Sequence, residues 1–245
     1  MSAPRIKSES GFYHIMNRGV SLMTIFEDDE DRLTFLRLLA SLASKDSIEL
    51  HAYCLMSNHY HLLVHDGHDA LSHFCQSLNA AYATYFNEKH GRSGTLFQSR
   101  FRSEVVKDDE QYLTVLRYIV QNPLKAGLGS PEEYPWSSYA EYGQKRGAVE
   151  PYFAAKMLGG LDHLRAFLRE PGDASCLDVF AESTRSDAAL RKHLISEFGC
   201  SASEVPGMEK GQRDHILASL RAAGFSVRRI ERVTGVGRGI IQRAR

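Results

Sequence analysis

The sequence has few cysteines, no long apolar run and no segment typical of an export signal. Its four cysteines are scattered and form no CxxC pair, which argues against a zinc ribbon or a disulfide framework and favours a reducing compartment. The first ten residues hold no apolar segment, and no stretch of 18 apolar residues occurs. We therefore expect a soluble, cytoplasmic protein with no membrane partner.

The sequence also lacks an excess of charge of either sign. Thirty Lys and Arg balance 30 Asp and Glu, so the net charge neither supports nor excludes a nucleic-acid partner. The distribution is more informative, because residues 211–245 contain eight Arg and no Lys against one Asp and one Glu. A basic block of this kind indicates a polyanionic partner. The 43% of hydrophobic residues is enough for an ordinary globular core.

Strand-like and helical patterns alternate in the first half of the chain. The predicted strands are Phe12–Asn17, Glu49–Met56, Tyr60–His65 and Ser103–Lys107, and the third of them could equally begin at His59. The predicted helices are Asp28–Ser44, Leu71–Lys89 and Glu110–Gln121. This β-α-β-β-α-β order with a trailing helix predicts an α+β fold. It is the ferredoxin-like split βαβ arrangement, an antiparallel sheet with helices on one face.

The hydrophobic pattern lapses around Gly143–Gly147, and we place a domain boundary there. Residues 1–142 form the predicted first domain, whose aromatic-rich tail, Pro131–Tyr142, is expected to fold back on it. Residues 143–206 are predicted to be a helical connecting region, to which the sequence assigns no function. Residues 207–245 are predicted to form a small all-α module with a helix-turn-helix.

Two histidines in the third predicted strand have the spacing of metal ligands. Side chains at i and i+2 of a strand point to the same face, about 6.6 Å apart along the chain. His59 and His61 can therefore converge on one divalent cation, while Tyr60 faces the other way. Such an ion would polarise an oxygen of a scissile phosphate. The alternative is a pair of surface histidines on a polar strand face. A third ligand could come from the other histidines, although a structural role is expected for each of them: His14, His51, His65, His73 and His90.

A tyrosine in the third predicted helix is a candidate nucleophile. Tyr118 and Asn122 are four residues apart and share a helix face. A tyrosine can attack a phosphodiester and form a covalent phosphotyrosine, and a carboxamide oxygen beside it would complete the metal site that the histidines begin. The spacing does not separate Asn122 from Gln121, and it does not exclude Tyr112. A helix tyrosine can equally be a packing residue.

Several ordered motifs together resemble one known family. The run CLMSNHYHLLV resembles the HUH motif of single-tyrosine HUH transposases. The runs RSGTLFQSRFRSEVV, YLTVLRYIVQNPLKAGL and YPWSSYAEY resemble in particular the REP-associated tyrosine transposases. The resemblance runs from about Phe12 to Tyr142. One departure is Tyr60, whose position is more often aliphatic and lies on the strand face opposite the histidines.

The resemblance implies a function and a set of residue roles. It makes residues 1–142 a catalytic domain that cleaves and rejoins single-stranded DNA near a small hairpin, with Mg²⁺ or Mn²⁺ as the cofactor. His59, His61 and Asn122 would be the metal ligands. Tyr118 would be the nucleophile that forms a 5′-phosphotyrosine link and releases a 3′-OH. The same branch implies a monomer that acts in cis rather than a dimer.

Basic and aromatic residues between the motifs fit a path for single-stranded DNA. In such paths arginines bind phosphates and aromatic rings stack on bases. The alternative is a solvated loop with core aromatics. The candidates are Arg18, Arg92, Phe97, Arg100, Arg102 and Arg117.

The basic C-terminal block has the pattern of two short helices joined by a turn. Ser226 is predicted to cap the first helix, Thr234 and Gly235 to form the turn, and Val236–Arg245 to form the second helix. We expect this module to bind duplex DNA, and the alternative is a basic helical pair that packs on the first domain. The candidate contacts are Arg228, Arg229, Arg238 and Arg243.

Three functional hypotheses follow. The leading one is a metal-dependent transposase that acts through Tyr118. The second is a domesticated transcriptional regulator that binds DNA through the helix-turn-helix and has lost the chemistry. The third is a metal phosphodiesterase that activates water, which would form no protein–DNA adduct.

Overall fold

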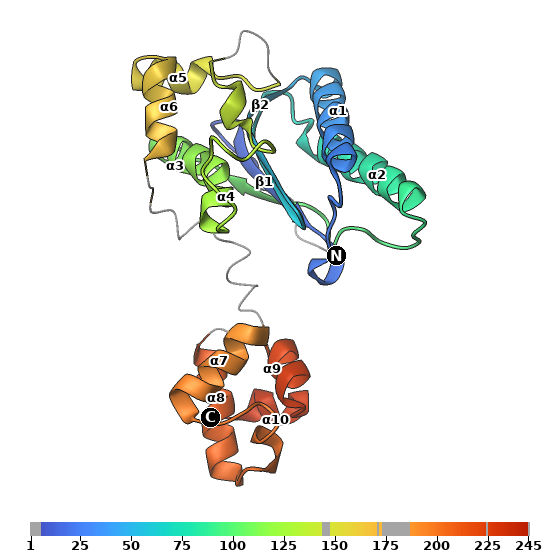
Figure 1. The fold of residues 1–245 in the computed structure, drawn as a ribbon, viewed down its shortest axis with the longest axis vertical. Helices are drawn as coiled ribbons and strands as arrows, with labels where there is room; N and C mark the ends of the chain where they lie inside the picture. Colours follow the sequence, from blue (N-terminus) through green and yellow to red (C-terminus); the bar gives the residue numbers. More distant parts are fainter. Residues whose placement is uncertain (1–5, 144–147, 171, 173–186, 224, 245) are drawn as a thin grey trace. The chain divides into compact units, whose positions relative to one another are not determined.

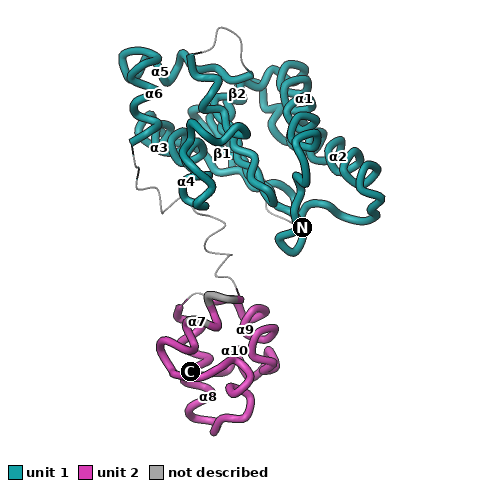
Figure 2. The backbone as a smooth tube through the Cα atoms, in the orientation of Figure 1, with its two compact units in different colours: residues 1–174 teal, residues 175–245 magenta. Residues whose placement is uncertain are grey.

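The computed structural model of the protein describes residues 6–143, 148–170, 172, 187–223 and 225–244. The chain divides into two compact units, Met1–Ala174 and Ser175–Arg245 (Figure 2). The first unit extends past the boundary predicted around Gly143–Gly147, of which residues 144–147 lie outside the described part of the chain. Among the helices of the described ranges, none has the length and apolar character that a membrane crossing requires.

A four-stranded antiparallel sheet forms the centre of the first unit (Figure 1). Its strands lie in the order β2-β3-β1-β4, so β1 and β3 are the inner strands. The predicted α+β fold is confirmed, and each strand lies within two residues of its predicted bounds. The strands are β1 (Phe12–Arg18), β2 (Ile48–Met56), β3 (His59–Asp66) and β4 (Arg102–Val105), and a short 3-10 helix, η1 (Val20–Leu22), follows β1.

Two helices cover one face of the sheet, α1 (Asp29–Asp46) and α2 (Leu71–Lys89). Tyr60 of β3 points to this face. Its ring packs against Phe35 of α1, and its hydroxyl donates a hydrogen bond to Asn79 of α2 (2.8 Å). These are the two helices that the split βαβ pattern places together on one face.

The trailing helix lies on the opposite face of the sheet (Figure 1). This helix, α3 (Asp109–Val120), brings the ring of Tyr112 beside His51 of β2 and the ring of Tyr118 beside His61 of β3. Because helices cover both faces, the inner strands are buried along nearly their whole length.

A short helix, α4 (Asn122–Lys125), follows α3 after a break at Gln121. Pro123 lies in its first turn. Proline has no N–H for the helix ladder and its ring clashes with the preceding turn, so α3 cannot continue and the chain changes direction here. The break sets the positions of Gln121 and Asn122, the two carboxamides that sequence spacing does not separate.

The aromatic-rich tail folds back on β2, as predicted. Ser137 pairs with Cys54 through an isolated β-bridge, and a 3-10 helix, η2 (Ser138–Glu141), follows. The hydroxyl of Tyr142 donates to the main-chain oxygen of His51 (2.7 Å). The tail therefore covers part of the outer strand β2.

Two further helices, α5 (Tyr152–Leu158) and α6 (Leu161–Arg169), belong to the first unit. The side-chain amide of Gln121 donates to the main-chain oxygen of Leu168 (2.9 Å), which fixes the end of α6 to the end of α3. This part of the predicted connecting region is thus packed on the sheet domain. The sequence pattern shows short helices there but does not show what they pack against.

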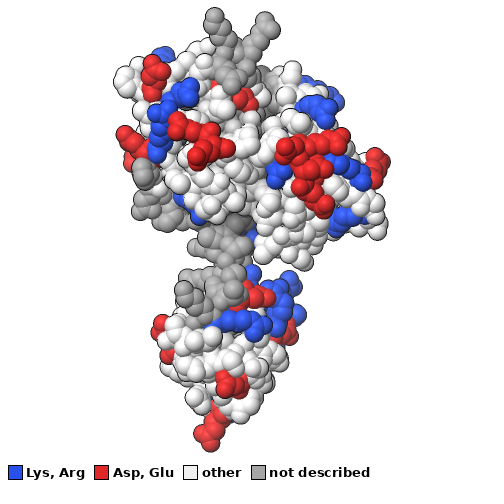
Figure 3. All heavy atoms as spheres, in the orientation of Figure 1, with Lys and Arg blue, Asp and Glu red and all other residues white. Residues whose placement is uncertain are grey.

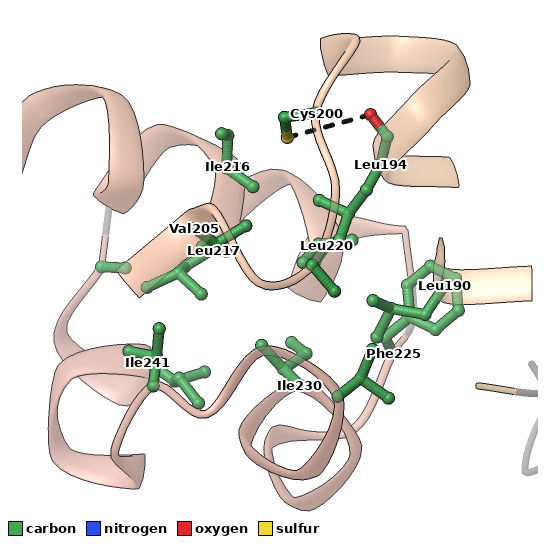
Figure 4. Close-up of a cluster of buried hydrophobic side chains, with 14 residues drawn as sticks. Leu190, Leu194, Cys200, Val205, Ile216, Leu217, Leu220, Phe225, Ile230 and Ile241 are labelled. Carbon is green, nitrogen blue, oxygen red and sulfur yellow. Dashed lines mark hydrogen bonds between the residues drawn. The ribbon is translucent and has the colours of Figure 1, made fainter. Parts of the chain in front are cut away.

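The second unit is helical and has its own apolar core (Figure 4). Leu190 and Leu194 lie in the same buried cluster as Leu220, Ile230 and Ile241. The N-terminal helix of this unit, predicted as part of the connecting region, therefore belongs to the C-terminal core. The elements are α7 (Asp187–Phe198), η4 (Val205–Gly207), α8 (Lys210–Ala222), α9 (Val227–Thr234) and α10 (Arg238–Arg243).

The turn between α9 and α10 has the chemistry that the sequence indicates. The Ser226 hydroxyl accepts a hydrogen bond from the third residue of the first turn and caps α9. Gly235 ends α9 with a φ of 75°, a left-handed conformation that favours glycine. α10 is shorter than the predicted Val236–Arg245, because Gly237 stays extended and glycine is a poor helix former. Arg245 lies outside the described residues.

Candidate active site

His59 and His61 lie on the same face of β3, on the side that α3 covers. Their ring centroids are 5.1 Å apart. Tyr60, between them, points to the other face, as the alternation of a strand requires. The structure thus places the two imidazoles close enough to converge on one ion.

Each of the two rings has a hydrogen-bond partner at Nδ1. Nδ1 of His59 lies 2.7 Å from Oδ1 of Asn58, and Nδ1 of His61 lies 3.0 Å from Nε2 of His14. Metal-bound histidines usually place their second nitrogen against such a partner, which fixes the ring and its tautomer. Nε2 is therefore the atom through which each histidine would coordinate an ion.

Burial keeps the central imidazoles neutral. It holds the pKa of His61 well below the ordinary histidine value, and the neighbouring His59, His14 and Lys125 lower it further. Burial also lowers the pKa of His14 to about 3. Both rings are therefore neutral at physiological pH, which is the form that a metal ligand must have.

Tyr118 approaches the histidines from α3. Its ring centroid lies 5.6 Å from that of His61 and 5.8 Å from that of His14. Nζ of Lys125 lies 4.3 Å from the centre of the tyrosine ring. The phenol is thus held between a sheet histidine and a cation from α4.

Lys125 was not identified from the sequence. It follows Tyr118 by seven residues and Asn122 by three, spacings that keep residues on one helix face. That spacing is a signal that could have found it. Pro123 interrupts the helix between them, however, so the pattern alone does not extend the face, and only the folded chain shows that Lys125 reaches the tyrosine ring.

The second candidate tyrosine, Tyr112, lies elsewhere. Its hydroxyl lies 2.8 Å from Nδ1 of His51, and its ring packs against Phe12 and Phe153. Tyr112 is 1% exposed, and burial raises its pKa. Tyr118, not Tyr112, is the tyrosine of α3 that contacts His61.

The two carboxamides at the end of α3 have separate surroundings. The side-chain nitrogen of Gln121 donates to the main-chain oxygens of Leu168 (2.9 Å) and Glu170 (2.6 Å). The side-chain nitrogen of Asn122 donates to the main-chain oxygen of Tyr118 (2.9 Å). Gln121 therefore holds α6, whereas Asn122 stays beside the tyrosine.

The predicted donor set mixes imidazole nitrogens with a neutral oxygen. Among the described residues, no group of three or more His, Cys, Asp or Glu side chains is placed to hold a metal. The predicted set has only two such residues, His59 and His61, with Asn122 as a neutral oxygen donor. Two imidazoles and a carboxamide leave positions for phosphate oxygens and water, which fits Mg²⁺ or Mn²⁺.

Two predicted DNA contacts lie on the site face of the sheet. Residues that pair directly across antiparallel strands share a face. Arg18 pairs with His59, and Met16 pairs with both His61 and Arg102. Arg18 and Arg102 therefore flank the histidine pair. The Arg18 Nε donates to a side-chain oxygen of the loop before β4 (2.6 Å), and Arg102 is exposed.

Phe97 and Arg92 have packing partners in the first unit. The Phe97 ring packs at 6.2 Å from Tyr60 and 6.5 Å from Tyr82, on the side of α1 and α2. The Arg92 guanidinium lies over the ring of Phe86 at 5.8 Å. Neither is brought to the histidine pair.

Arg117 and Arg100 differ in how far their side chains are buried. The Arg117 guanidinium lies 4.4 Å from the centre of the Phe167 ring of α6. A Cβ on Gly172 would clash with its Nε, so the backbone closes over it. Arg117 is therefore a packing residue between α3 and α6, whereas Arg100 is exposed.

The predicted DNA contacts of the second unit are four arginines, Arg228, Arg229, Arg238 and Arg243. Arg229 and Arg232 form ion pairs with Asp187, and Arg238 pairs with Glu231. On the face shown in Figure 3, basic side chains of this unit gather at the end where α9 lies. Arg228 of α9 and Arg243 of α10 are exposed to solvent.

Part of the first unit matches a known protein family. Residues 7–122 match the model of the family described as IS200-like transposases. This part of the chain is similar to IS200-like transposases. The match covers β1 to the start of α4 and so includes His59, His61, Tyr118 and Asn122.

Two solved structures are similar to this chain. One is a REP-associated tyrosine transposase bound to a REP hairpin, with 16% identity, coverage of 71% of this chain and 93% of that chain, and a TM-score of 0.48. The other is a putative transposase from Deinococcus radiodurans R1, with 19% identity, coverage of 49% and 95%, and a TM-score of 0.35. No curated protein matches the chain significantly.

Proposed function

We propose that the protein is a metal-dependent transposase, a strand transferase that cleaves single-stranded DNA beside a hairpin and forms a covalent link through Tyr118. One observation carries the proposal most directly: the Tyr118 ring lies 5.6 Å from the ring of His61. The family match supports DNA processing, and the motif resemblance supports the single-tyrosine mechanism and the hairpin substrate.

The chemistry is an in-line exchange at phosphorus. The phenolic oxygen of Tyr118 attacks the scissile phosphate, a tyrosine–phosphorus bond forms to the 5′ side, and the bond from phosphorus to the 3′ oxygen breaks. The phenol proton passes to solvent and the 3′ oxygen leaves as a hydroxyl after protonation. Mg²⁺ or Mn²⁺, held by His59, His61 and Asn122, would supply polarisation of a phosphoryl oxygen.

The chain's own cations bind and orient the strand in this proposal. Lys125 lies against the Tyr118 ring and can neutralise a phosphate placed beside the phenol. Arg18 and Arg102 flank the histidines on the same face and can hold the phosphates on either side. Tyr118 contacts His61 of the same chain, which supports the proposal of a monomer acting in cis.

The test is adduct formation on a labelled oligonucleotide that carries a hairpin with a single-stranded flank. In Mn²⁺, the protein should give a band of reduced mobility on a denaturing gel. Tyr118→Phe should abolish the band, and Tyr112→Phe is the matched control that should retain it. His59→Ala should lose it as well. Cleavage without an adduct would instead indicate a phosphodiesterase that activates water. Loss of the adduct in Tyr112→Phe but not in Tyr118→Phe would identify Tyr112 as the nucleophile.

The second unit supports an additional role in duplex DNA binding. It has its own core, and its exposed basic residues include Arg228 and Arg243. The regulator hypothesis would assign the whole function to this unit. Calorimetric titration with Mn²⁺ separates the two ideas, because a regulator without chemistry need not bind the ion, whereas the strand transferase must.

A further inference from the structure

His14 of β1 lies beside the histidine pair, and neither the motifs nor the family match gives it a role. It is 1% exposed, and its ring stacks on that of His61 with centroids 5.2 Å apart and planes inclined by 26°. Its Nε2 lies 3.0 Å from Nδ1 of His61. Its ring also meets that of Tyr118 at 5.8 Å. His14 thus contacts both a proposed ligand and the proposed nucleophile.

The hydrogen bond between the two rings has only two arrangements. Two neutral imidazoles share one proton across such a contact, so one ring donates and the other accepts. If His14 donates, His61 carries its own proton on Nε2, and that nitrogen cannot coordinate an ion. If His14 accepts, the proton of His61 lies on Nδ1 and Nε2 can coordinate. The direction of this bond therefore decides whether His61 can be a ligand.

We propose that His14 is a positioning residue, which accepts a hydrogen bond from Nδ1–H of His61 and so holds His61 in the tautomer that coordinates through Nε2. The inference rests on the proposed function in one respect, since it takes His61 to be a metal ligand. It adds a residue from the neighbouring strand that supports the metal centre without touching the ion.

In this arrangement the proton of His14 lies on its other nitrogen, Nδ1. Nδ1 of His14 is buried and has no hydrogen-bond partner among the described residues. An unsatisfied buried polar atom destabilises a fold, and an apolar residue of similar size would avoid the cost. The hydrogen bond to His61 at Nε2 offsets part of this cost. A histidine at this position is therefore explained by what it does for His61.

The first test reads the tautomer directly in the full chain. Histidine is labelled with ¹⁵N, the protein is loaded with Zn²⁺ as a diamagnetic probe, and the ring nitrogens are assigned from their couplings to the ring protons. We expect His61 to carry its proton on Nδ1 and the metal on Nε2. A proton on Nε2 of His61, or coordination through Nδ1, would overturn the inference. This measurement uses the unaltered protein and does not depend on any variant folding.

The second test separates the hydrogen bond from packing. His14→Leu removes the acceptor, and His14→Gln replaces it with a side-chain oxygen of similar reach. By calorimetry with Mn²⁺, we expect His14→Leu to bind about 10- to 100-fold more weakly and His14→Gln to recover most of the affinity. The control is His51→Leu, which removes an equally buried histidine that contacts Tyr112 instead.

The outcomes show separately whether the positioning role of His14 fails and whether the strand-transfer proposal fails. Unchanged Mn²⁺ affinity in His14→Leu, failure of His14→Gln to recover it, or an equal loss in His51→Leu would each overturn the positioning role. If the unaltered protein forms no tyrosine adduct yet shows the expected tautomer and affinities, the strand-transfer proposal fails while the role of His14 at the metal centre holds. An adduct together with the reverse tautomer would support strand transfer and overturn the role of His14.

Discussion

The side-chain amide of Asn122 donates a hydrogen bond to the main-chain oxygen of Tyr118, at 2.9 Å. The bond links the first residue of α4 to the last turn of α3, which carries the proposed nucleophile. Because the nitrogen makes this bond, the oxygen of the carboxamide is the atom that would coordinate an ion. A neutral oxygen is a suitable ligand for Mg²⁺ or Mn²⁺.

Exchange of the two adjacent carboxamides for alanine should give opposite results. We expect Asn122→Ala to weaken Mn²⁺ binding by roughly tenfold or more. Gln121→Ala should leave the affinity unchanged but lower the free energy of unfolding by about 1–3 kcal/mol, because two main-chain oxygens lose their donor. Calorimetry and urea unfolding measure the two quantities. The reverse pattern would assign the ligand to Gln121.

The two histidines of β3 should differ in what their loss does to stability. His59 is half-buried, so His59→Ala should abolish high-affinity Mn²⁺ binding with a change in unfolding free energy of about 1 kcal/mol or less. His61 is buried, so His61→Ala should also leave a cavity and destabilise the fold by about 2 kcal/mol. If Mn²⁺ binding survives either change, the histidine pair is not the metal site.

Lys125 should affect the rate of the reaction rather than metal binding. Lys125→Gln removes the cation beside the Tyr118 ring and should slow adduct formation by roughly 100-fold, while Mn²⁺ affinity stays within the error of the measurement. Lys125→Arg should retain part of the rate. Single-turnover kinetics on the hairpin oligonucleotide measure the effect, with the exposed Lys107→Gln as the control. Equal rates of adduct formation in Lys125→Gln and Lys107→Gln would show that Lys125 does not take part in the reaction.

A buried carboxylate at the start of α1 should set the acid stability of the first unit. Asp31 is fully buried and completes the capping box with Asp28. Burial by itself would raise its pKa, but hydrogen bonds from Lys89 and His90 outweigh it and bring the pKa below the ordinary value of 3.8. A depressed folded pKa means that the stabilisation is present above the unfolded value and is lost as the pH falls through the folded one.

Asp31→Asn should therefore be pH-dependent in its effect. We expect it to lower the free energy of unfolding by roughly 2 kcal/mol at pH 7 and pH 5. The difference from the unaltered protein should shrink as the pH falls from the ordinary value of 3.8 through the lower pKa of the folded state. Urea unfolding at several pH values measures it. The exposed Asp29→Asn should change stability little, and a pH-independent loss in Asp31→Asn would contradict the assignment.

Duplex binding by the second unit should depend on its exposed arginines. The double variant Arg228→Ala, Arg243→Ala should weaken duplex binding and reduce the slope of log affinity against log salt by about 2, as expected for two lost phosphate contacts. Arg221 is the contrasting control, because its guanidinium bonds the main-chain oxygens at the end of α10. Arg221→Ala should lower the stability of the unit more than the salt slope. Adduct formation on hairpin DNA should continue in both.

Much of this site could be predicted from local sequence patterns. The spacing of His59 and His61 puts them on one strand face in any sheet, and the spacing of Tyr118 and Asn122 puts them on one helix face. Strand and helix periodicity also predicted the order of elements in the sheet domain, since these patterns depend on neighbours in sequence. The motif resemblance then placed the histidine pair and the pair of Tyr118 and Asn122 in one proposed site.

The remaining features depend on contacts between distant segments. His14 meets His61 because β1 pairs with β3 in one particular register. Tyr118 faces His61 while Tyr112 faces His51 because α3 crosses the sheet in one particular position. Periodicity fixes which side of an element a residue lies on, but not which partner covers that side. Only the packing of the whole sheet domain, which buries apolar surface on both faces at once, selects those partners.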